Sequence, residues 1–149
     1  MLVGYNGTNT NVVVPTYIDG KKVFAVKETA FANNTNLKSI TFDASLKHIY
    51  NNAFLGCTSL ENFSAKNATN IGSDAFNGCQ ALERIFIDNL YEIGDRAFKD
   101  CASLLNVNTE HAEKLGADAF KGCSSLLSFS SDMLKQFDLS YLSDCVSLE

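Results

Sequence analysis

Apolar residues recur along this chain of 149 residues with one fixed period. Phenylalanines stand 22 residues apart at Phe54, Phe76, Phe98 and Phe120. Cysteines follow with the same spacing at Cys57, Cys79, Cys101, Cys123 and Cys145. A period of about 20 to 50 residues is typical of a solenoid, in which each repeat forms one coil that stacks on its neighbours. The pattern therefore predicts a stack of short coils.

Three further columns of the repeat are apolar when the coils are aligned on Phe31, the four phenylalanines above and Leu142. Five residues before this column stand Val26, Ile49, Ile71, Ile93, Leu115 and Phe137. Six residues after it stand Leu37, Leu60, Leu82, Leu104, Leu126 and Leu148. Nine residues after it stand Ile40, Phe63, Ile85, Val107 and Phe129. We expect all of them to point inward, because stacked coils bury like residues against one another.

Two columns near the phenylalanine indicate the local backbone. Two residues after it stand only Asn, Gly or Asp, which tolerate a left-handed conformation: Asn33, Gly56, Gly78, Asp100, Gly122 and Asp144. Three residues before it, the middle coils carry helix N-cap types: Asn51, Ser73 and Asp95. We therefore expect each coil to hold about one helical turn, opened by the cap residue and closed by the left-handed residue.

After this turn the hydrophobic period changes to two. Residues 37–42 and 82–87 both read Leu, two polar residues, Ile, one residue, then an apolar residue. Such alternation predicts a short strand with one face inward. Strands of successive coils must be parallel, because the chain makes the same circuit each time.

The N-terminal residues depart from the period. A β-branched run at 12–14 ends at Pro15, and Asp19-Gly20 predicts a tight turn inside a hairpin-like lead-in. We expect residues 1–25 to cap the open end of the stack. Residues 26–149 then hold five to six repeats of 22–23 residues in a single structural domain, as part of a longer array.

Composition narrows the functional classes. The chain is 46% hydrophobic and 19% charged, which predicts a globular protein. The net charge of −5 and the absence of a basic stripe argue against nucleic acid as a partner. No run of about 18 apolar residues is present, so we expect no membrane insertion by this segment. The first seven residues lack the features of a signal peptide, so the protein is intracellular or its leader lies outside this sequence.

The repeat resembles a known family. Its pattern Leu-x-x-Ile-x-Ile, followed by Ile-Gly-x-x-Ala-Phe-x-x-Cys-x-x-Leu, is similar to the BspA-type leucine-rich repeat, and residues 11–23 resemble the usual opening of such arrays. The resemblance covers roughly residues 4–148. Asn34 replaces the cysteine in the first coil, and residues 138–142 lack the Gly-x-x-Ala-Phe motif, so we expect irregular terminal coils.

The resemblance implies an α/β solenoid: a right-handed leucine-rich repeat with a parallel β-sheet on one face, and short helical turns and extended segments on the other. It also implies a secreted or cell-surface protein associated with adhesion to host proteins or to other cells. No catalytic residue and no cofactor is implied.

The five evenly spaced cysteines could form a disulfide, a metal site or a buried ladder of thiols. Stacked side chains place their Cβ atoms about 4.8 Å apart, slightly too far for an unstrained disulfide. Zinc sites typically use Cys-x-x-Cys pairs, which this chain lacks. We therefore expect a ladder of inert, buried thiols and no metal.

Catalysis has no candidate constellation. His48 and His111 lie in different predicted loops, and no motif pairs either with a nucleophile. The glycines recur with the coil period, so no phosphate-binding loop is indicated. We expect the protein not to be an enzyme.

The outward face of the strand ladder remains as a candidate binding site. The residues that alternate with the inward column of Ile40, Phe63, Ile85, Val107 and Phe129 should point outward, and they form three columns. From these columns we select Asn62, Ser64, Lys66, Arg84, Phe86, Asp88, Asn106, Asn108 and Glu110. Phe86 is a large apolar group on a face expected to be wet, and it lies beside Arg84. Aromatic residues and arginine are enriched at interface hot spots.

These observations favour non-catalytic recognition of a protein ligand, such as a host or cell-surface protein, by a module of a larger secreted or surface protein. One alternative is a structural spacer that projects another domain. Another is carbohydrate binding, for which only Phe86, Tyr50 and Tyr91 offer exposed aromatic rings.

Overall fold

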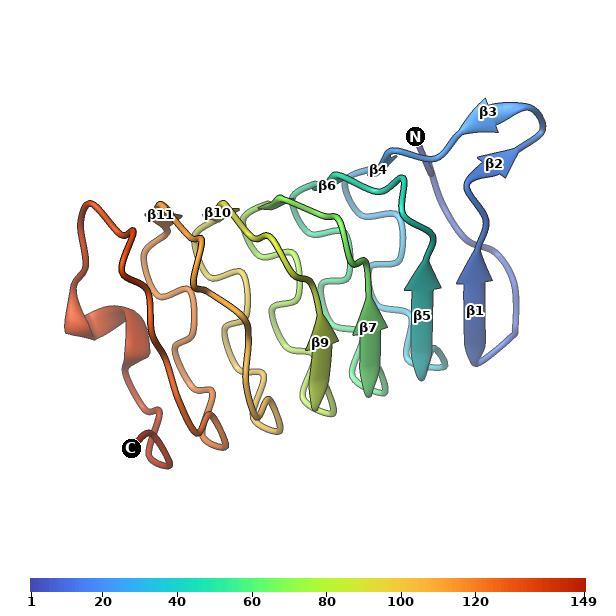
Figure 1. The fold of residues 1–149 in the computed structure, drawn as a ribbon. Coiled ribbons are helices and arrows are strands. Elements are labelled where there is room, and N and C mark those ends of the chain that lie inside the picture. Colours follow the sequence, from blue (N-terminus) through green and yellow to red (C-terminus); the bar gives the residue numbers. More distant parts are fainter.

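Successive segments of the chain stack side by side along one axis in the computed structural model, which describes residues 1–149 (Figure 1). The two termini lie at opposite ends of the stack. The predicted solenoid is confirmed, and its coils are joined by two parallel sheets that run along the axis.

The first sheet has the strand order β1-β5-β7-β9 and faces the viewer in Figure 1. Its strands are β1 (Asn11–Val14), β5 (Ser39–Phe42), β7 (Asn62–Ser64) and β9 (Arg84–Phe86). All three pairings are parallel, as predicted, and the register places Ile40 beside Phe63 and Phe63 beside Ile85. Beyond β9 the sheet continues only as a single bridge between Arg84 and Asn106.

The second sheet is narrower, with two residues per strand. Its order is β4 (Ala25–Val26), β6 (His48–Ile49), β8 (Asn70–Ile71), β10 (Glu92–Ile93) and β11 (Lys114–Leu115). One residue of each strand faces outward from β6 onward, and the other enters the core. The two sheets thus form two walls of each coil.

The lead-in contains the predicted hairpin. Strands β2 (Tyr17–Ile18) and β3 (Lys21–Lys22) pair in antiparallel fashion. Asp19 and Gly20 between them have φ of 49° and 72°, which is the left-handed geometry that a tight hairpin turn requires. Strand β1, which precedes this hairpin, pairs in parallel with β5 and so extends the first sheet by one strand.

The predicted left-handed column is confirmed in all six coils. Its φ angles lie between 59° and 77° at Asn33, Gly56, Gly78, Asp100, Gly122 and Asp144. The predicted helical turn is wrong for the first five coils, which contain a series of tight turns instead. A second left-handed column interrupts any helix two residues before the phenylalanine, at Thr29, Asn52, Asp74, Arg96 and Asp118. The one helix is a short 3₁₀ segment in the last coil, Leu139–Leu142, capped by Asp138.

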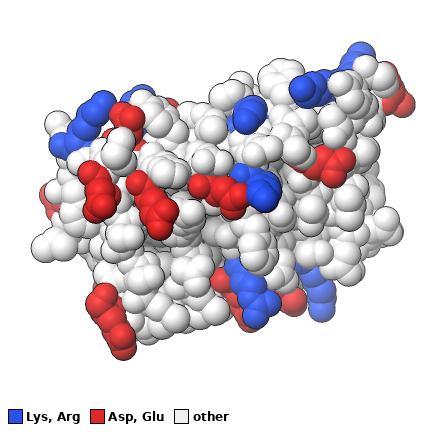
Figure 2. All heavy atoms as spheres, viewed as in Figure 1, with Lys and Arg blue, Asp and Glu red and all other residues white.

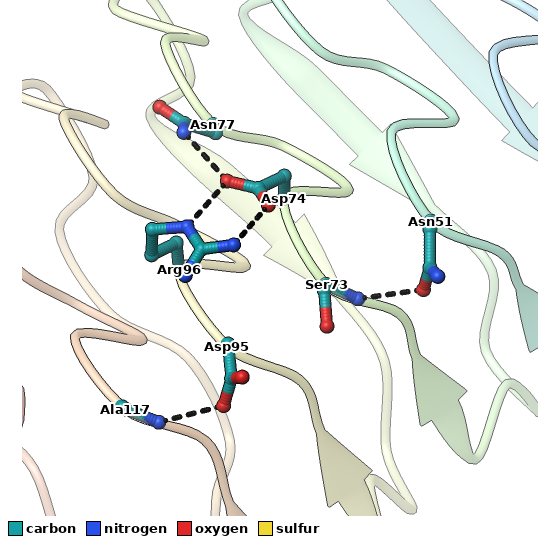
Figure 3. A network of polar contacts seen from close by, with 7 residues as sticks. All are labelled: Asn51, Ser73, Asp74, Asn77, Asp95, Arg96 and Ala117. Atoms are coloured by element: carbon teal, nitrogen blue, oxygen red, sulfur yellow. Dashed lines mark hydrogen bonds and ion pairs between the residues drawn. The ribbon is translucent and has the colours of Figure 1, made fainter.

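The expected helix caps have another role. The Oδ1 atom of Asn51 accepts a hydrogen bond of 2.9 Å from the backbone N–H of Ser73, which lies in the next coil (Figure 3). Asp95 accepts a bond of the same length from the N–H of Ala117. These side chains therefore join neighbouring coils and do not cap their own turn.

The core is a continuous stack of rings. Phe31, Phe54, Phe76, Phe98 and Phe120 stack almost parallel, with centroids between 4.8 and 5.3 Å apart. Phe63 packs edge-on against Phe54 and Phe76, at 5.3 and 4.9 Å. Offset and edge-to-face pairs at such distances add to the free energy gained by burial. The inward columns predicted from the sequence thus form one core cluster, joined at its margins by the half-buried Leu115, Phe129 and Leu148.

Phe137 departs from its predicted inward position. Its side chain is 43% exposed and stacks on Phe129, with ring centroids 5.5 Å apart. The turn of this last coil forms the 3₁₀ helix described above instead of the tight turns of the other coils. The register inferred from the earlier coils therefore does not hold at this residue.

Candidate binding face

The outward side chains of the first sheet lie in register across its four strands. One row joins Val13, Thr41, Ser64 and Phe86 through successive strand pairings. Val13 is 73% exposed and Phe86 is 54% exposed, so two large apolar groups stand on an otherwise polar face. The backbone beneath both residues is held by the pairing of β1 with β5 and of β7 with β9.

The nine residues selected from the sequence share this face. Asn62 and Ser64 lie on β7, and Arg84 and Phe86 lie on β9. Asn106 follows as the partner of the single bridge. Five residues lie beyond the sheet strands: Lys66, Asp88, Asn106, Asn108 and Glu110. Asn62 and Ser64 are half-buried, and the other seven are exposed. Whether any of them touches a ligand stays a prediction.

Val13 belongs to the same face but was not selected. The sequence placed it in the cap, because the repeat period begins only after residue 25. Its neighbours Val12 and Val14 are more buried than Val13, which is the alternation expected of a strand with one outward face. That alternation was the available signal, obscured by three identical residues in a row.

A row of charged side chains lies along the ends of the sheet strands. Its members are Asp43, Lys66, Asp88, Glu110 and Asp132, all exposed. Figure 2 shows red side chains in a row across this face, with one blue group among them. Lys66 pairs with Asp88 at 3.7 Å, and Asp43 accepts hydrogen bonds from the backbone N–H and the hydroxyl of Thr16, each of 3.2 Å. Glu110 and Asp132 form no ion pair, so this end of the row is uncompensated.

Polar side chains also join neighbouring coils at the turns near the phenylalanine column. Arg96 donates two hydrogen bonds to the carboxylate of Asp74, of 3.0 and 2.7 Å (Figure 3). The Asn77 amide donates a third, of 2.8 Å. The Arg96 guanidinium beside Asp74 lowers the pKa of that carboxyl below its ordinary value. This network holds the stack together on the side away from the candidate face.

The second sheet carries a shallow polar groove of about 300 Å³. Its floor includes Gly72 and Gly94, and polar side chains of the neighbouring columns line it. The ring of Tyr50, which is 41% exposed, stacks against His48 at its margin, with centroids 6.3 Å apart.

The predicted thiol ladder is confirmed. All five cysteines are free, and four are buried; Cys145 in the last coil is half-buried. Each thiol donates to the carbonyl oxygen of the phenylalanine column in the preceding coil, over 3.0–3.2 Å. Burial raises the pKa of Cys79, Cys101 and Cys123 well above the ordinary thiol value. Protonated, buried thiols are poor nucleophiles, so these three cysteines serve packing.

The remaining residues with potential chemistry stand apart. No group of three or more His, Cys, Asp or Glu side chains lies where it could hold a metal ion. His48 lies at the groove on the second sheet, whereas His111 follows Glu110 at the end of the charged row. No helix in the structure has the length and apolar character needed to cross a membrane.

Fold and surface together define a leucine-rich-repeat solenoid with an open, polar sheet face. A profile of the BspA type leucine rich repeat region matches residues 9–149 in six copies, and the chain belongs to this family.

The fold is similar to those of solved leucine-rich-repeat structures. A leucine rich repeat protein of T. pallidum is 32% identical, with a TM-score of 0.80 over 85% of this chain. A leucine rich cell surface protein of Faecalibacterium prausnitzii is 21% identical, with a TM-score of 0.55 over 87% of this chain, and a leucine-rich repeat protein of Bacteroides ovatus is 22% identical, with a TM-score of 0.59 over 94%. The chain covers 60%, 49% and 42% of these three proteins, respectively. A search of the curated proteins found no match.

Proposed function

We propose that this chain is a non-catalytic protein-binding module of a secreted or cell-surface protein. Its binding face is the outer side of β1, β5, β7 and β9 together with the charged row at the strand ends. Solenoids use such extended surfaces for recognition. The family resemblance to surface adhesins and the similarity to a leucine rich cell surface protein support this assignment.

The exposure of Phe86 carries the proposal. Its ring is 54% exposed although it stands on a paired strand, and Arg84 precedes it by two residues on the same face. An aromatic ring on a rigid backbone loses little conformational entropy on binding, which is why aromatic residues and arginine dominate interface hot spots. The polar neighbours Ser64 and Asn62 supply hydrogen-bonding groups around this anchor.

Binding to immobilised fibronectin, laminin and collagen tests this function, because these are proteins that a surface adhesin would meet. The Phe86→Ala variant should weaken any interaction of the wild-type chain by about tenfold or more. Tyr17→Ala is the matched control, since Tyr17 is 59% exposed but lies on the separate hairpin. Equal affinities of the wild-type and Phe86→Ala proteins would remove Phe86 from the binding face.

A spacer that only projects another domain is the alternative. In that case substitutions on the sheet face change neither binding nor stability. Carbohydrate binding is a second candidate, favoured by the exposed Tyr50 ring beside the polar groove of the second sheet. A glycan array probed with the wild-type and Tyr50→Ala proteins separates it from the protein-binding function.

A further inference from the structure

A hollow of about 340 Å³ lies at the end of the charged row, between two segments that are one coil apart. It is lined by Glu110, His111, Ser130, Ser131, Asp132 and Met133. This volume is near the lower limit for small-molecule sites, about 300 to 1,000 Å³, and suits one long side chain.

The walls of the hollow are fixed by two hydrogen bonds between the coils. The Thr109 hydroxyl donates to the carbonyl oxygen of Ser130 over 2.6 Å, and the Ser131 hydroxyl donates to that of Ala112 over 2.9 Å. Thr109 is only 2% exposed and is the one buried polar residue of the protein. A cavity held in this way needs no reorganisation before it is filled, which lowers the entropic cost of binding.

The charge of the hollow is negative and uncompensated. Glu110 and Asp132 are exposed, and neither carboxylate forms an ion pair or accepts a hydrogen bond within the protein. By contrast, Asp88 of the same row is paired with Lys66 at 3.7 Å. No lysine or arginine lines the hollow.

Met133 adds an apolar surface to the same hollow. Its side chain is 51% exposed, and the thioether of methionine adapts readily to an apolar partner. Lysine and arginine combine an aliphatic stem with a cationic head, which matches one apolar wall and two carboxylates. No cluster of three potential metal ligands exists here, so the donors suit one cationic head better than a metal ion.

We propose that this hollow binds a lysine or arginine side chain of the polypeptide that the sheet face recognises. The inference rests on the proposed function and names the chemistry of the partner: a basic segment lying along the charged row. Phe86 then supplies the apolar anchor, and Glu110 with Asp132 supplies the charge selection.

Titration of the isotope-labelled chain with acetyl-lysine-amide, followed by NMR, tests the hollow directly. The amide signals of Glu110, Ser131 and Met133 should shift in a saturable way. Acetyl-norleucine-amide has the same stem without the charge and should leave these signals in place. The dissociation constant of acetyl-lysine-amide should rise by about tenfold in the double variant Glu110→Gln, Asp132→Asn, because the ammonium group loses its contacts with both carboxylates.

The matched control removes two carboxylates elsewhere. Glu28 and Glu83 are exposed and form no ion pair, so Glu28→Gln with Glu83→Gln gives the same net charge and should bind the probe as the wild type does. The proposal would be overturned if the amide signals near Asp43 and Glu83 shifted as much as those of the hollow. It would also be overturned if the signals of the hollow in the wild-type chain showed no saturable shift. The latter result leaves the Phe86 experiment unaffected, since that experiment uses whole matrix proteins.

Discussion

The Cys101 thiol donates a 3.1 Å hydrogen bond to the carbonyl oxygen of Phe76, 25 residues earlier in the preceding coil. The same bond recurs from coil to coil, so each thiol occupies both a packing position and a donor position. Its proton is engaged, and its sulfur is out of reach of solvent.

Thiol labelling should therefore distinguish the last coil from the others. In the folded protein only Cys145, which is half-buried, should react readily with a disulfide reagent. All five thiols should react once the chain is unfolded. Rapid labelling of two or more thiols in the native state, or fewer than five in denaturant without reductant, would contradict the buried ladder.

Substitution of Gly94 by alanine should destabilise the solenoid. A Cβ atom there would lie 2.6 Å from the backbone nitrogen of Ser73 and 2.7 Å from the carbonyl carbon of Gly72, so the coils would have to separate. Such overpacking costs about 1 to 3 kcal/mol of unfolding free energy. Gly4→Ala is the control, since nothing lies within 4 Å of its Cβ position. Urea denaturation of both variants measures the difference, and equal midpoints would refute the close approach.

Replacement by alanine should destabilise the protein strongly at Phe76 and hardly at Phe86. Phe76 is fully buried between Phe54 and Phe98, so its loss should cost about 3 to 5 kcal/mol of unfolding free energy. Phe86→Ala, on the exposed face, should change that free energy by less than about 0.5 kcal/mol. Thermal unfolding of both variants makes the comparison. A large loss for Phe86→Ala would mean that its ring serves the fold.

Acid should weaken the contact between Asp74 and Arg96. The guanidinium lowers the pKa of Asp74 in the folded state, so the stability from this pair is complete above the unfolded pKa of about 3.9. That stability is lost as the pH falls through the lower, folded-state pKa. The Asp74→Asn variant should thus be slightly less stable than the wild type at neutral pH and nearly equal to it in strong acid.

The control for this titration occupies the same place in another coil. Asp118 has the same φ of 56° as Asp74, but it forms no ion pair. Asp118→Asn should therefore show no comparable pH-dependent difference from the wild type. Parallel pH dependences of the two variants would show that the ion pair contributes nothing measurable, as is common for exposed pairs.

The repeat, the parallel strands and the inward columns were predictable because each follows from residue type and period alone. The left-handed position after the phenylalanine was predictable for the same reason, since only Gly, Asn and Asp stand there. The second left-handed position was missed, because Thr29 and Arg96 rarely adopt that conformation and hide the column. A helical turn was inferred in its place.

Residue type could not reveal which chain segment a polar group bonds to. Asn51 and Asp95 are good helix caps, yet their acceptors serve the backbone of the next coil. The outward direction of Phe86 followed from alternation along its strand. The hollow beside Glu110 did not, because its shape depends on the course of two loops and on the bond between Thr109 and Ser130.

The backbone hydrogen bonds of the phenylalanine column all point toward the next coil: the N–H of Phe54 donates to the carbonyl of Ala75, and the N–H of Phe76 donates to that of Ala97. Every middle coil thus repeats the same set of donors and acceptors toward its two neighbours, and can be exchanged for its neighbour. Duplication or loss of one whole repeat leaves every junction intact, whereas an insertion of a few residues breaks the register of the two parallel sheets. Gain or loss of whole repeats therefore offers a route to lengthen or shorten the proposed binding face in uniform steps while the structure of each coil stays the same.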